Sequence, residues 1–250
     1  MQKLSHLSLS VVLPTFNEEE NIVQTVENAL IALKQYIPEY EIIIVNDGSR
    51  DETGNLTAKL AEAHDTVRVI KHPVNRGYGG ALRSGFEAST KEFVFFTDSD
   101  GQFRFDEIQK FIPLLGEYDM LLGFREDRQD PWFRKLNSRI GNLLARLMLE
   151  IHVRDINCAF KFFRRSLLQD LPLRSQGAFI NTEILAYARR SEWSLFQLPV
   201  KHYPRLRGNP TGAHPAVILK TFKEYFELKE RLLAGSHTTP LRTSNPLHKS

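Results

Sequence analysis

Two aspartates, Asp98 and Asp100, form a D-x-D motif directly after the apolar run Phe93–Thr97. If the extended backbone continues through the motif, both carboxylates project to the same side of the chain. Mg²⁺ takes oxygen ligands, often one or two protein carboxylates together with the phosphate oxygens of a substrate. Gln102 continues the alternation and could add a carbonyl oxygen. A solvated acidic turn is the alternative, but the position after a predicted strand favours a cation site.

Two polar segments follow apolar runs earlier in the chain. The segment NDGS at 46–49 has the residue types of a tight turn. An acid at such a strand end also hydrogen-bonds the nucleoside in other nucleotide-binding α/β proteins, so nucleotide contact is the functional alternative. The segment PTFNEE at 14–19 supplies acids that suit the start of a helix. Asn17 and Glu18 lie closer to the strand end and are candidates for binding.

A glycine-rich segment, NRGYGG at 75–80, precedes a predicted helix. Exposed backbone N–H groups at a helix start favour anions, so this segment could bind a phosphate. It matches neither a Walker A loop nor the full G-x-G-x-x-G pattern. A tight structural loop therefore remains an equal alternative.

The elements that must position these segments alternate between short strands and helices. Apolar runs predict strands at Leu9–Leu13, Glu41–Val45, Val67–Ile70 and Phe93–Thr97, and helical spacing predicts helices at Glu19–Gln35, Asp51–Ala63 and Gly79–Ala88. This alternation predicts a parallel sheet with helices on both faces. Ligands of such sheets bind beyond the carboxyl ends of the strands, which is where the polar segments lie.

The pattern changes after residue 122. The predicted elements there are a basic helix at Phe133–Leu149, a strand at Phe160–Phe163, a helix at Thr182–Arg190, a strand at Ser194–Val200 and a helix at Ala216–Leu233. Residues 235–250 are rich in Ser, Thr and Pro, which predicts a disordered tail. The fold class is therefore α/β.

Composition and charge limit the possible functions. The 250 residues include a single cysteine, Cys158, which excludes an intramolecular disulfide and a cysteine-based zinc cluster. The net charge is only +3, but residues 123–250 carry 22 basic and 11 acidic side chains, against 11 and 19 in residues 1–122. This asymmetry indicates an anionic partner. The basic residues are scattered and no nucleic-acid motif is present, so a phosphorylated small molecule or a membrane surface is favoured over nucleic acid.

The chain is expected to be cytoplasmic, because the amino terminus has no secretory-signal pattern and no run of about 18 apolar residues could span a bilayer. Helix 216–233 is amphipathic, with four basic and three acidic side chains among its apolar ones. It could lie on the cytoplasmic membrane face as a peripheral anchor. Packing on the domain and contact with a membrane-protein partner are the alternatives.

The motifs PTFNEEENI, IIIVNDGSRDET, NRGYGGALRSGF and FTDSDGQF occur in the order seen in family-2 glycosyltransferases of the GT-A fold. The resemblance is greatest to dolichyl- and polyprenyl-phosphate mannose or glucose synthases and covers about residues 8–210. It implies that a nucleotide-sugar donor contacts Pro14, Thr15, Asn17, Glu18, Asn46, Asp47, Gly77, Asp98 and Ser99. It also implies Mg²⁺ or Mn²⁺ on Asp98 and Asp100, and Gln102 is a further candidate ligand from the alternation noted above.

The second half resembles the same family in four segments. Gly123–Arg125 with Arg128 is similar to a G-x-R segment that faces phosphates, and Arg154–Lys161 is similar to a D-x-x-S-G-F-R/K segment. Asn181–Glu183 matches a D-T-E segment of the acceptor region, and His202–Arg205 with Gly208 matches a stretch that closes over the diphosphate. The resemblance implies donor contacts for Arg125, Arg128, Lys161, His202 and Arg205, and catalytic roles for Asp155 and Glu183. Pairing of Asp155 with a neighbouring arginine and a structural role for His202 stay open.

The chain departs from the family pattern at four places. Asn46 replaces a common Asp, Cys158-Ala159 replaces Ser-Gly, Lys161 occupies a frequent Arg position, and Asn181 replaces an acid. An amide at position 181 cannot act as a general base. A phosphate monoester acceptor needs none, because its second pKa is about 6 and it is already an anion at neutral pH.

The resemblance therefore predicts one GT-A domain over residues 1–234, with a mostly parallel nucleotide-binding sheet and a mixed-strand acceptor half. Its parts are a nucleotide-sugar-binding half at 8–122, an acceptor half at 123–213 and a C-terminal helix at 214–234. The predicted activity is metal-dependent, inverting transfer of a hexose from a GDP-mannose or UDP-glucose type donor to a dolichyl or polyprenyl phosphate. A soluble transferase acting on a saccharide or small molecule, and a non-catalytic nucleotide-binding module, are the alternatives.

Overall fold

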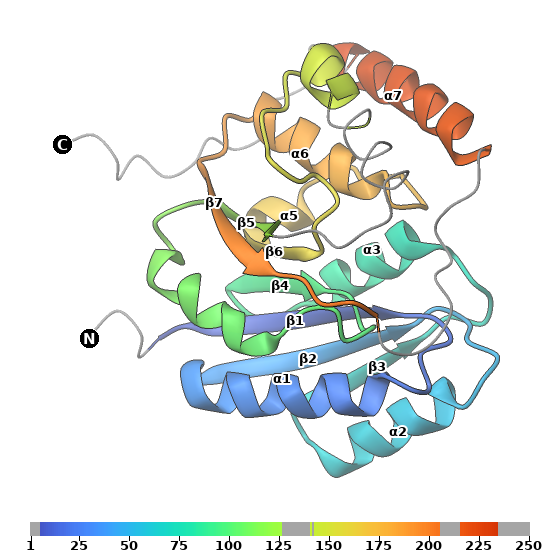
Figure 1. Ribbon diagram of the computed structural model, residues 1–250, viewed down its shortest axis with the longest axis vertical. Helices are drawn as coiled ribbons and strands as arrows, with labels where there is room; N and C mark the ends of the chain where they lie inside the picture. The colour runs from blue at the N-terminus through green and yellow to red at the C-terminus, as the bar shows by residue number, and fades with distance from the viewer. Residues whose placement is uncertain (1–5, 127–140, 142, 206–215, 235–250) are drawn as a thin grey trace.

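The computed structural model describes residues 6–126, 141, 143–205 and 216–234, and the side chains of residues 216–222 and 234 are outside this description. A seven-stranded sheet with the order β3-β2-β1-β4-β6-β5-β7 forms its centre (Figure 1). The strands are β1 Ser8–Thr15, β2 Glu39–Asn46, β3 Val67–Lys71, β4 Phe93–Thr97, β5 Met120–Glu126, β6 Phe160–Arg164 and β7 Leu195–Lys201. The helices are α1 Ile22–Tyr36, α2 Thr53–Ala63, α3 Tyr78–Ala88, η2 Phe105–Lys110, η3 Ile112–Leu114, α5 Arg165–Gln169, α6 Ile180–Arg190 and α7 Ala216–Ala234.

The pairing of the strands confirms a mostly parallel sheet with a mixed second half. β1 pairs in parallel with β2 and β4, and β2 pairs in parallel with β3. β6 runs antiparallel to both β4 and β5, whereas β5 and β7 are parallel. The carboxyl ends of β1 to β4 therefore meet at one edge, as the sequence predicts.

Helices cover both faces of this sheet (Figure 1). The connections β1-α1-β2 and β2-α2-β3 lead the chain in one direction along the sheet, and β3-α3-β4 leads it back past β2 and β1. Because such crossovers are right-handed as a rule, α3 lies on the face opposite to α1 and α2. α3 lies close against β1 at Gly85, where an added Cβ would be 2.3 Å from Val12 Cγ1. This close packing fixes the start of α3 relative to the ends of the strands.

Aromatic side chains join the two halves of the sheet. β4 and β6 are neighbours, and Phe95 stacks on Phe162 with ring centroids 4.3 Å apart. Phe111 stacks on Phe162 from the 3₁₀ region, and Phe160 packs against both Phe95 and Phe111. These rings are buried and form one core with the apolar residues of β1 and β2.

Several elements differ from the sequence prediction. β5 was not predicted, because only Met120, Leu121 and Leu122 give it an apolar run before Gly123. The 3₁₀ helices η2 and η3 and the short helix α5 were also missed. Of the predicted helix 133–149, residues 141 and 143–149 are described and are helical, and the predicted tail lies outside the described residues. No helix within the described ranges is long and apolar enough to cross a membrane.

Candidate active site

The two aspartates of the D-x-D motif lie at the carboxyl end of β4. Asp98 Oδ1 accepts a hydrogen bond from the Tyr78 hydroxyl at 3.0 Å, and Asp100 Oδ1 accepts one from the backbone N–H of Gln102 at 3.0 Å. Burial, followed by the charge of Asp100, raises the pKa of Asp98 to about 7. Burial also raises the pKa of Asp100. A pair of partly buried carboxylates whose ionisation is disfavoured in this way fits a cation site, because a bound cation stabilises both charges.

This donor set suits Mg²⁺ or Mn²⁺ bound together with a phosphorylated ligand. Within the part of the chain that the structure describes, no group of three His, Cys, Asp or Glu side chains is placed to hold a metal by itself. Two carboxylates with further oxygens from a substrate phosphate are a common arrangement for Mg²⁺. The Gln102 amide, the third predicted ligand, donates from Nε2 to the Tyr203 carbonyl at 3.0 Å.

Arg205 joins the loop after β1 to the D-x-D motif. Its Nη2 is 2.6 Å from Glu18 Oε1, and its Nη1 is 3.7 Å from Asp100 Oδ2. The amide of Asn21 donates to the other Glu18 oxygen at 2.8 Å. A guanidinium therefore stands beside two of the acids that the sequence assigns to the donor site.

The segment next to Arg205 is tied to the same motif. The N–H of Tyr203 donates to the Gln102 carbonyl at 2.9 Å, which adds to the side-chain hydrogen bond between these residues. The His202 ring packs edge-on against Phe103 at 5.1 Å. Gly208, which the resemblance groups with this segment, and Arg128, which it groups with the G-x-R segment, lie outside the described residues.

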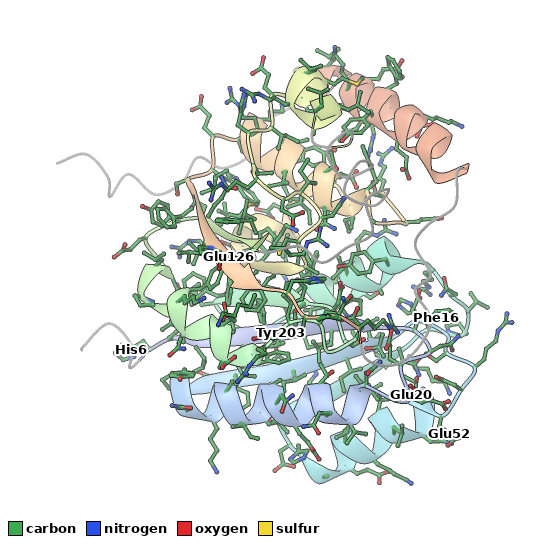
Figure 2. The ribbon with its side chains drawn as sticks, in the orientation of Figure 1. His6, Phe16, Glu20, Glu52, Glu126 and Tyr203 are labelled. Carbon is green, nitrogen blue, oxygen red and sulfur yellow. The ribbon has the colours of Figure 1, made fainter. Side chains whose placement is uncertain are left out.

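The loops after β1 and β2 are bonded to each other. The N–H of Asn17 donates to Ser49 Oγ at 3.0 Å, and the N–H of Arg50 donates to Asn17 Oδ1 at 2.9 Å. Asn46 Oδ1 accepts from the Ser49 N–H at 3.0 Å. Figure 2 labels Phe16, Glu20 and Glu52 at this end of the sheet. Asn17 has a φ of 53°, a left-handed conformation that asparagine tolerates better than most residues.

The Asp47 carboxylate is buried and ties β2 to the loop after β3. Its Oδ1 is 2.6 Å from His72 Nδ1 and accepts from the Arg76 N–H at 2.8 Å. The second ring nitrogen of His72 is 2.9 Å from Ser84 Oγ on α3. Asp47 thus holds the glycine-rich segment in place, and its predicted contact with the nucleoside stays a prediction.

Buried polar contacts also link the end of β1 to the D-x-D motif. Ser99 Oγ donates to the Pro14 carbonyl at 3.0 Å, and Thr25 Oγ1 on α1 donates to the Ser99 carbonyl at 3.1 Å. The Thr15 carbonyl accepts from the Asp47 N–H at 2.9 Å. The structure therefore brings Pro14, Thr15 and Ser99 to one edge with Asp47 and Asp98.

Asp155 forms the ion pair with a neighbouring arginine that the sequence left open. The partner is Arg125, whose Nε and Nη2 donate to the two carboxylate oxygens at 2.7 and 3.0 Å. Both side chains are largely buried, and such bidentate pairs have a fixed geometry. Asp155 is thereby oriented, and its catalytic role stays a prediction.

Three of the departures from the family pattern meet at one buried cation. Lys161 Nζ donates to the Ile156 carbonyl at 2.9 Å, to the Cys158 carbonyl, and to Asn181 Oδ1 at 2.8 Å. Burial lowers the pKa of Lys161 to about 8 and raises that of the Cys158 thiol to about 12. The thiol is therefore protonated at neutral pH. The hydrogen bonds from Lys161 to the carbonyls of Ile156 and Cys158 stabilise the turn that follows Asp155.

Glu183 is fully buried inside α6. Its carboxylate accepts from the N–H groups of Arg174 and Ser175, the latter at 2.8 Å, and pairs with Arg231 Nη1 of α7 at 2.7 Å. The catalytic assignment of this acid stays a prediction, and the observed contacts are those of an anchor for the 174–175 backbone and for α7.

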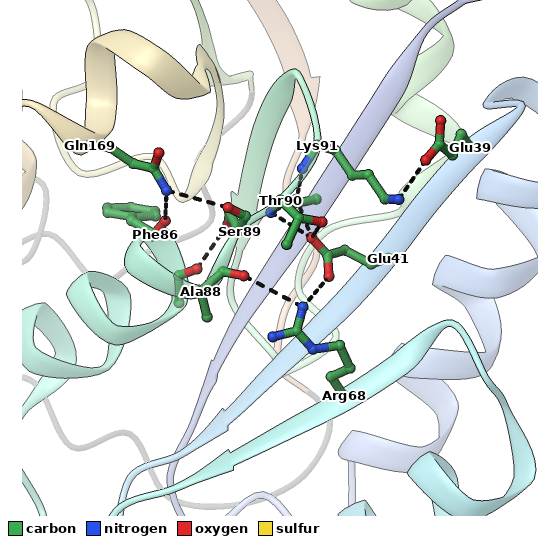
Figure 3. A network of polar contacts seen from close by, with 11 residues as sticks. Glu39, Glu41, Arg68, Phe86, Ala88, Ser89, Thr90, Lys91 and Gln169 are labelled. Atoms are coloured by element: carbon green, nitrogen blue, oxygen red, sulfur yellow. Dashed lines mark hydrogen bonds and ion pairs between the residues drawn. The ribbon is translucent and has the colours of Figure 1, made fainter.

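Another buried acid, Glu41, lies at the opposite end of the sheet (Figure 3). Ser10 and Thr90 donate to its Oε1 at 2.7 Å, and Arg68 Nη1 lies 2.6 Å from its Oε2. Burial acts to raise the pKa of Glu41, but these hydrogen bonds and the Arg68 charge lower it overall. Glu41 is therefore a structural acid that joins β1, β2 and β3 at the entry to β4.

The family of the chain follows from comparison with known proteins. The sequence model described as Glycosyl transferase family 2 matches residues 10–172, a span from β1 to the loop after α5 that includes the D-x-D motif. The chain belongs to glycosyl transferase family 2. The resemblance seen in the sequence is thus confirmed, and the protein is a family-2 glycosyltransferase.

Curated relatives of this glycosyltransferase are named undecaprenyl-phosphate 4-deoxy-4-formamido-L-arabinose transferase. The protein from Proteus mirabilis (strain HI4320) is 31% identical over 238 residues, which cover 94% of this chain and 69% of the relative. The protein from Pseudomonas fluorescens (strain SBW25) is 32% identical over 239 residues, which cover 94% of this chain and 66% of the relative.

Solved structures confirm the GT-A fold of this glycosyltransferase. Glucosyl-3-phosphoglycerate synthase from Mycobacterium tuberculosis, in complex with phosphoglyceric acid, has a TM-score of 0.69 at 21% identity and covers 91% of this chain and 80% of the solved one. The same enzyme in complex with Mn²⁺ and UDP-glucose has a TM-score of 0.66 at 22% identity, covering 93% and 80%.

Three residues of the glycosyltransferase site were missed in the sequence. Tyr78 lies inside a glycine-rich segment that was interpreted only as a backbone loop, although a lone large side chain among glycines is a signal. His72 contacts Asp47, and Arg231 contacts Glu183, 48 residues earlier. No local sequence pattern predicts the contact between Arg231 and Glu183, because the two residues lie in different helices.

Proposed function

We propose that this glycosyltransferase transfers a sugar from a nucleotide-diphosphate donor to a polyprenyl phosphate, using Mg²⁺ or Mn²⁺. The observation that carries the proposal is the pair of carboxylates, Asp98 and Asp100, at the carboxyl end of β4, beside Arg205 and the loop after β1. The names of the curated relatives, which specify undecaprenyl phosphate, support the acceptor. Solved structures of the same fold with Mn²⁺ and UDP or UDP-glucose support the metal and the donor class.

In this proposal, the loops after β1 and β2 bind the nucleoside and the D-x-D motif holds the cation. Asp98, Asp100 and Gln102 would hold the cation, which supplies charge stabilisation to the departing diphosphate. The nucleotide-contacting set comprises Pro14, Thr15, Asn17, Glu18, Asn46, Asp47, Gly77 and Ser99. Because these residues converge at one edge, one bound donor can contact both loops.

Arginines complete the site by contacting the phosphates. Arg205 already stands beside Glu18 and Asp100, and Arg125 is oriented by Asp155. Charge-assisted hydrogen bonds from guanidinium groups to phosphate oxygens are short and strong. We assign Arg128 and His202 to the same phosphate-facing wall. Lys161 is buried and its three N–H donors are taken by Ile156, Cys158 and Asn181, so it supports the turn after Asp155 and does not contact a phosphate.

The transfer itself is a single displacement with inversion. An oxygen of the acceptor phosphate forms a bond to the anomeric carbon, while the bond from that carbon to the β-phosphate oxygen breaks and the nucleoside diphosphate leaves. Asp155 stabilises positive charge that develops on the sugar ring. The acceptor is already an anion, so no base is required, and the amide of Asn181 is compatible with that chemistry. Glu183, which is fully buried, holds the 174–175 backbone, and the catalytic role that the family resemblance implies for it stays a prediction.

We also propose that the C-terminal helix meets the membrane that contains the acceptor. α7 packs on the domain through Tyr225, whose hydroxyl donates to the Gly141 carbonyl at 2.9 Å. On an adjoining face of α7, Phe226 and Leu233 are 59% and 64% exposed. The helical segment 143–149 exposes Leu143 and Leu147 as well, at 54% and 71%. Packing on the domain and contact with a membrane thus involve different faces of one helix.

Point variants test the membrane contact better than a deletion of α7, because a deletion also removes the partner of buried Glu183. Phe226→Ser and Leu147→Ser together should reduce co-sedimentation with liposomes, whereas Ile31→Ser, which changes an exposed residue of α1, should not. Equal binding by the two proteins would refute the membrane contact.

A donor and acceptor panel tests the function. The protein is incubated with Mg²⁺ or Mn²⁺, a short polyprenyl phosphate and one donor at a time, and the products are identified by mass spectrometry. The donors are UDP-glucose, GDP-mannose and a nucleotide-diphosphate derivative of 4-deoxy-4-formamido-L-arabinose. A glycosylated polyprenyl phosphate that forms with metal and not with EDTA is the expected result. Transfer only to saccharide acceptors, or nucleotide binding without metal and without turnover, would contradict the proposal.

A further inference from the structure

Tyr78 contacts the first aspartate of the D-x-D motif and was not among the predicted site residues. It is the first residue of α3, and its hydroxyl donates to Asp98 Oδ1 at 3.0 Å. Asp98 Oδ1 can only accept in this contact, so the hydroxyl is the donor and one carboxylate oxygen of Asp98 is held by a fixed partner.

The backbone on either side of Tyr78 is fixed by close contact with residues 175–177. Gly77 has a φ of 80°, and an added Cβ there would lie 2.5 Å from the Gln176 carbonyl oxygen. An added Cβ at Gly79 would lie 2.2 Å from the Ser175 carbonyl oxygen, and the Gly79 N–H donates to the Gln176 carbonyl at 2.7 Å. Only glycines allow this approach. Tyr78 is thus the one side chain that this short stretch, 77–79, presents.

The opposing loop is itself anchored to buried groups. Arg83 of α3 donates to the Ser175 carbonyl at 2.9 Å, and Glu183 accepts from the Ser175 N–H. Glu183 in turn pairs with Arg231 of α7. A continuous set of hydrogen bonds and close contacts therefore runs from α7 through the 174–177 loop to the start of α3 and Tyr78.

We propose that Tyr78 is a positioning residue for the metal site of the D-x-D motif. Its hydroxyl fixes the rotation of the Asp98 carboxylate, so that the second oxygen points in one direction toward the cation. Tyr78 does not ligate the cation or touch the reacting atoms. The inference rests on the proposed function, because it assumes that Asp98 and Asp100 bind a divalent cation.

The geometry distinguishes this role from simple packing. A ring that only filled space would be served equally by phenylalanine, whereas an orienting role depends on the hydroxyl. Groups that orient metal ligands through hydrogen bonds typically change metal affinity by about 10- to 100-fold when they are removed. The hydroxyl of Tyr78 is therefore the atom to delete.

Tyr78→Phe is the test variant, and Tyr36→Phe is its control. Tyr36 also donates a hydrogen bond, to Gln109 at 3.4 Å, but it lies at the end of α1, outside the proposed site. Binding of Mn²⁺ to the full chain is measured directly, from the electron paramagnetic resonance signal of free Mn²⁺, with and without UDP or GDP. Asp100→Ala is measured in parallel as a reference for loss of the site.

We expect Tyr78→Phe to bind Mn²⁺ about tenfold more weakly or worse, with the melting temperature of the wild type. In turnover assays its deficit should shrink as Mn²⁺ is raised. Tyr36→Phe should match the wild type in both assays.

Two results would overturn the inference, and they differ. If Asp100→Ala loses Mn²⁺ while Tyr78→Phe binds it within about twofold of the wild type, against the change of tenfold or more expected for an orienting group, the positioning role alone is wrong. If Asp100→Ala also binds Mn²⁺ as the wild type does, the D-x-D metal site of the proposed function is wrong, and the inference falls with it.

Discussion

Arg205 lies beside two acids of the proposed donor and cation site, so removing it tests whether its charge competes with a bound cation. The guanidinium lies 3.7 Å from Asp100 Oδ2 and 2.6 Å from Glu18 Oε1, with 18% of the side chain exposed. A cation on the D-x-D motif would be repelled by this fixed positive charge. Arg205→Ala should therefore tighten binding of Mn²⁺ in the absence of donor.

The distance between Arg205 Nη1 and Asp100 Oδ2 sets the scale of the change in Mn²⁺ affinity. Two unit charges 3.7 Å apart interact by about 4.5 kcal/mol at an effective dielectric constant of about 20. Desolvation of the two groups offsets much of this energy, which leaves about 1–2 kcal/mol, or about a 5- to 30-fold change in the Kd for Mn²⁺. In turnover with the donor, Arg205→Ala should instead be harmful. The loss of charge-assisted hydrogen bonds to phosphate costs about 1.5–3 kcal/mol, which lowers kcat/KM by about 10- to 150-fold.

Calorimetric titration with Mn²⁺ measures the first effect, and turnover assays with the nucleotide-sugar donor measure the second. Arg164→Ala is the control, since Arg164 pairs with Glu92 at 3.2 Å beyond the other end of β4. Tighter metal binding together with weaker donor use is the predicted signature. Unchanged metal affinity, or parallel weakening of metal and donor binding, would refute the competition.

The remaining predictions concern buried charges. Glu41→Gln should lower the free energy of unfolding by about 1–3 kcal/mol at pH 7. Because the folded pKa of Glu41 is lowered from 4.5, its contribution is present above that pH and is lost as pH falls through the folded value. Urea titrations of the wild type and of Glu41→Gln at pH 7 and pH 3 check this. A difference in free energy of unfolding that is as large at pH 3 as at pH 7 would contradict it. Arg231→Met leaves Glu183 buried without its cation and should cost about 3–5 kcal/mol. Adding Glu183→Gln should recover part of that loss in thermal denaturation, and an additive double variant would show that the two side chains are uncoupled.

The first half of the fold was predictable because its signals are local. Parallel strands buried on both faces appear as apolar runs, and β4 has the predicted bounds Phe93–Thr97. Polar residues follow each run, so it could be predicted from the sequence alone that Asp98 and Asn46 lie at the carboxyl edge of the sheet. β5 was missed because its apolar run is short, and its pairing partners β6 and β7 are distant in the chain.

The surroundings of the site residues were less predictable, because they depend on contacts between distant segments. Arg125 was expected to face phosphate, and the structure adds a bidentate pair with Asp155. Lys161 and Asn181 each depart from the family pattern alone, but they contact each other in the folded chain. The position of the Tyr78 hydroxyl depends on close packing of glycines against a loop about 100 residues later. No spacing rule in the sequence encodes such contacts.

The central claim is that one divalent cation is held by the D-x-D motif beside the donor diphosphate. Anomalous diffraction at the manganese edge, from crystals grown with Mn²⁺ and UDP or GDP, locates the cation directly. We expect a single strong peak within coordination distance of the carboxylates of both Asp98 and Asp100 and of the diphosphate oxygens. A peak at another site, or bound nucleotide with no manganese at these carboxylates, would contradict it.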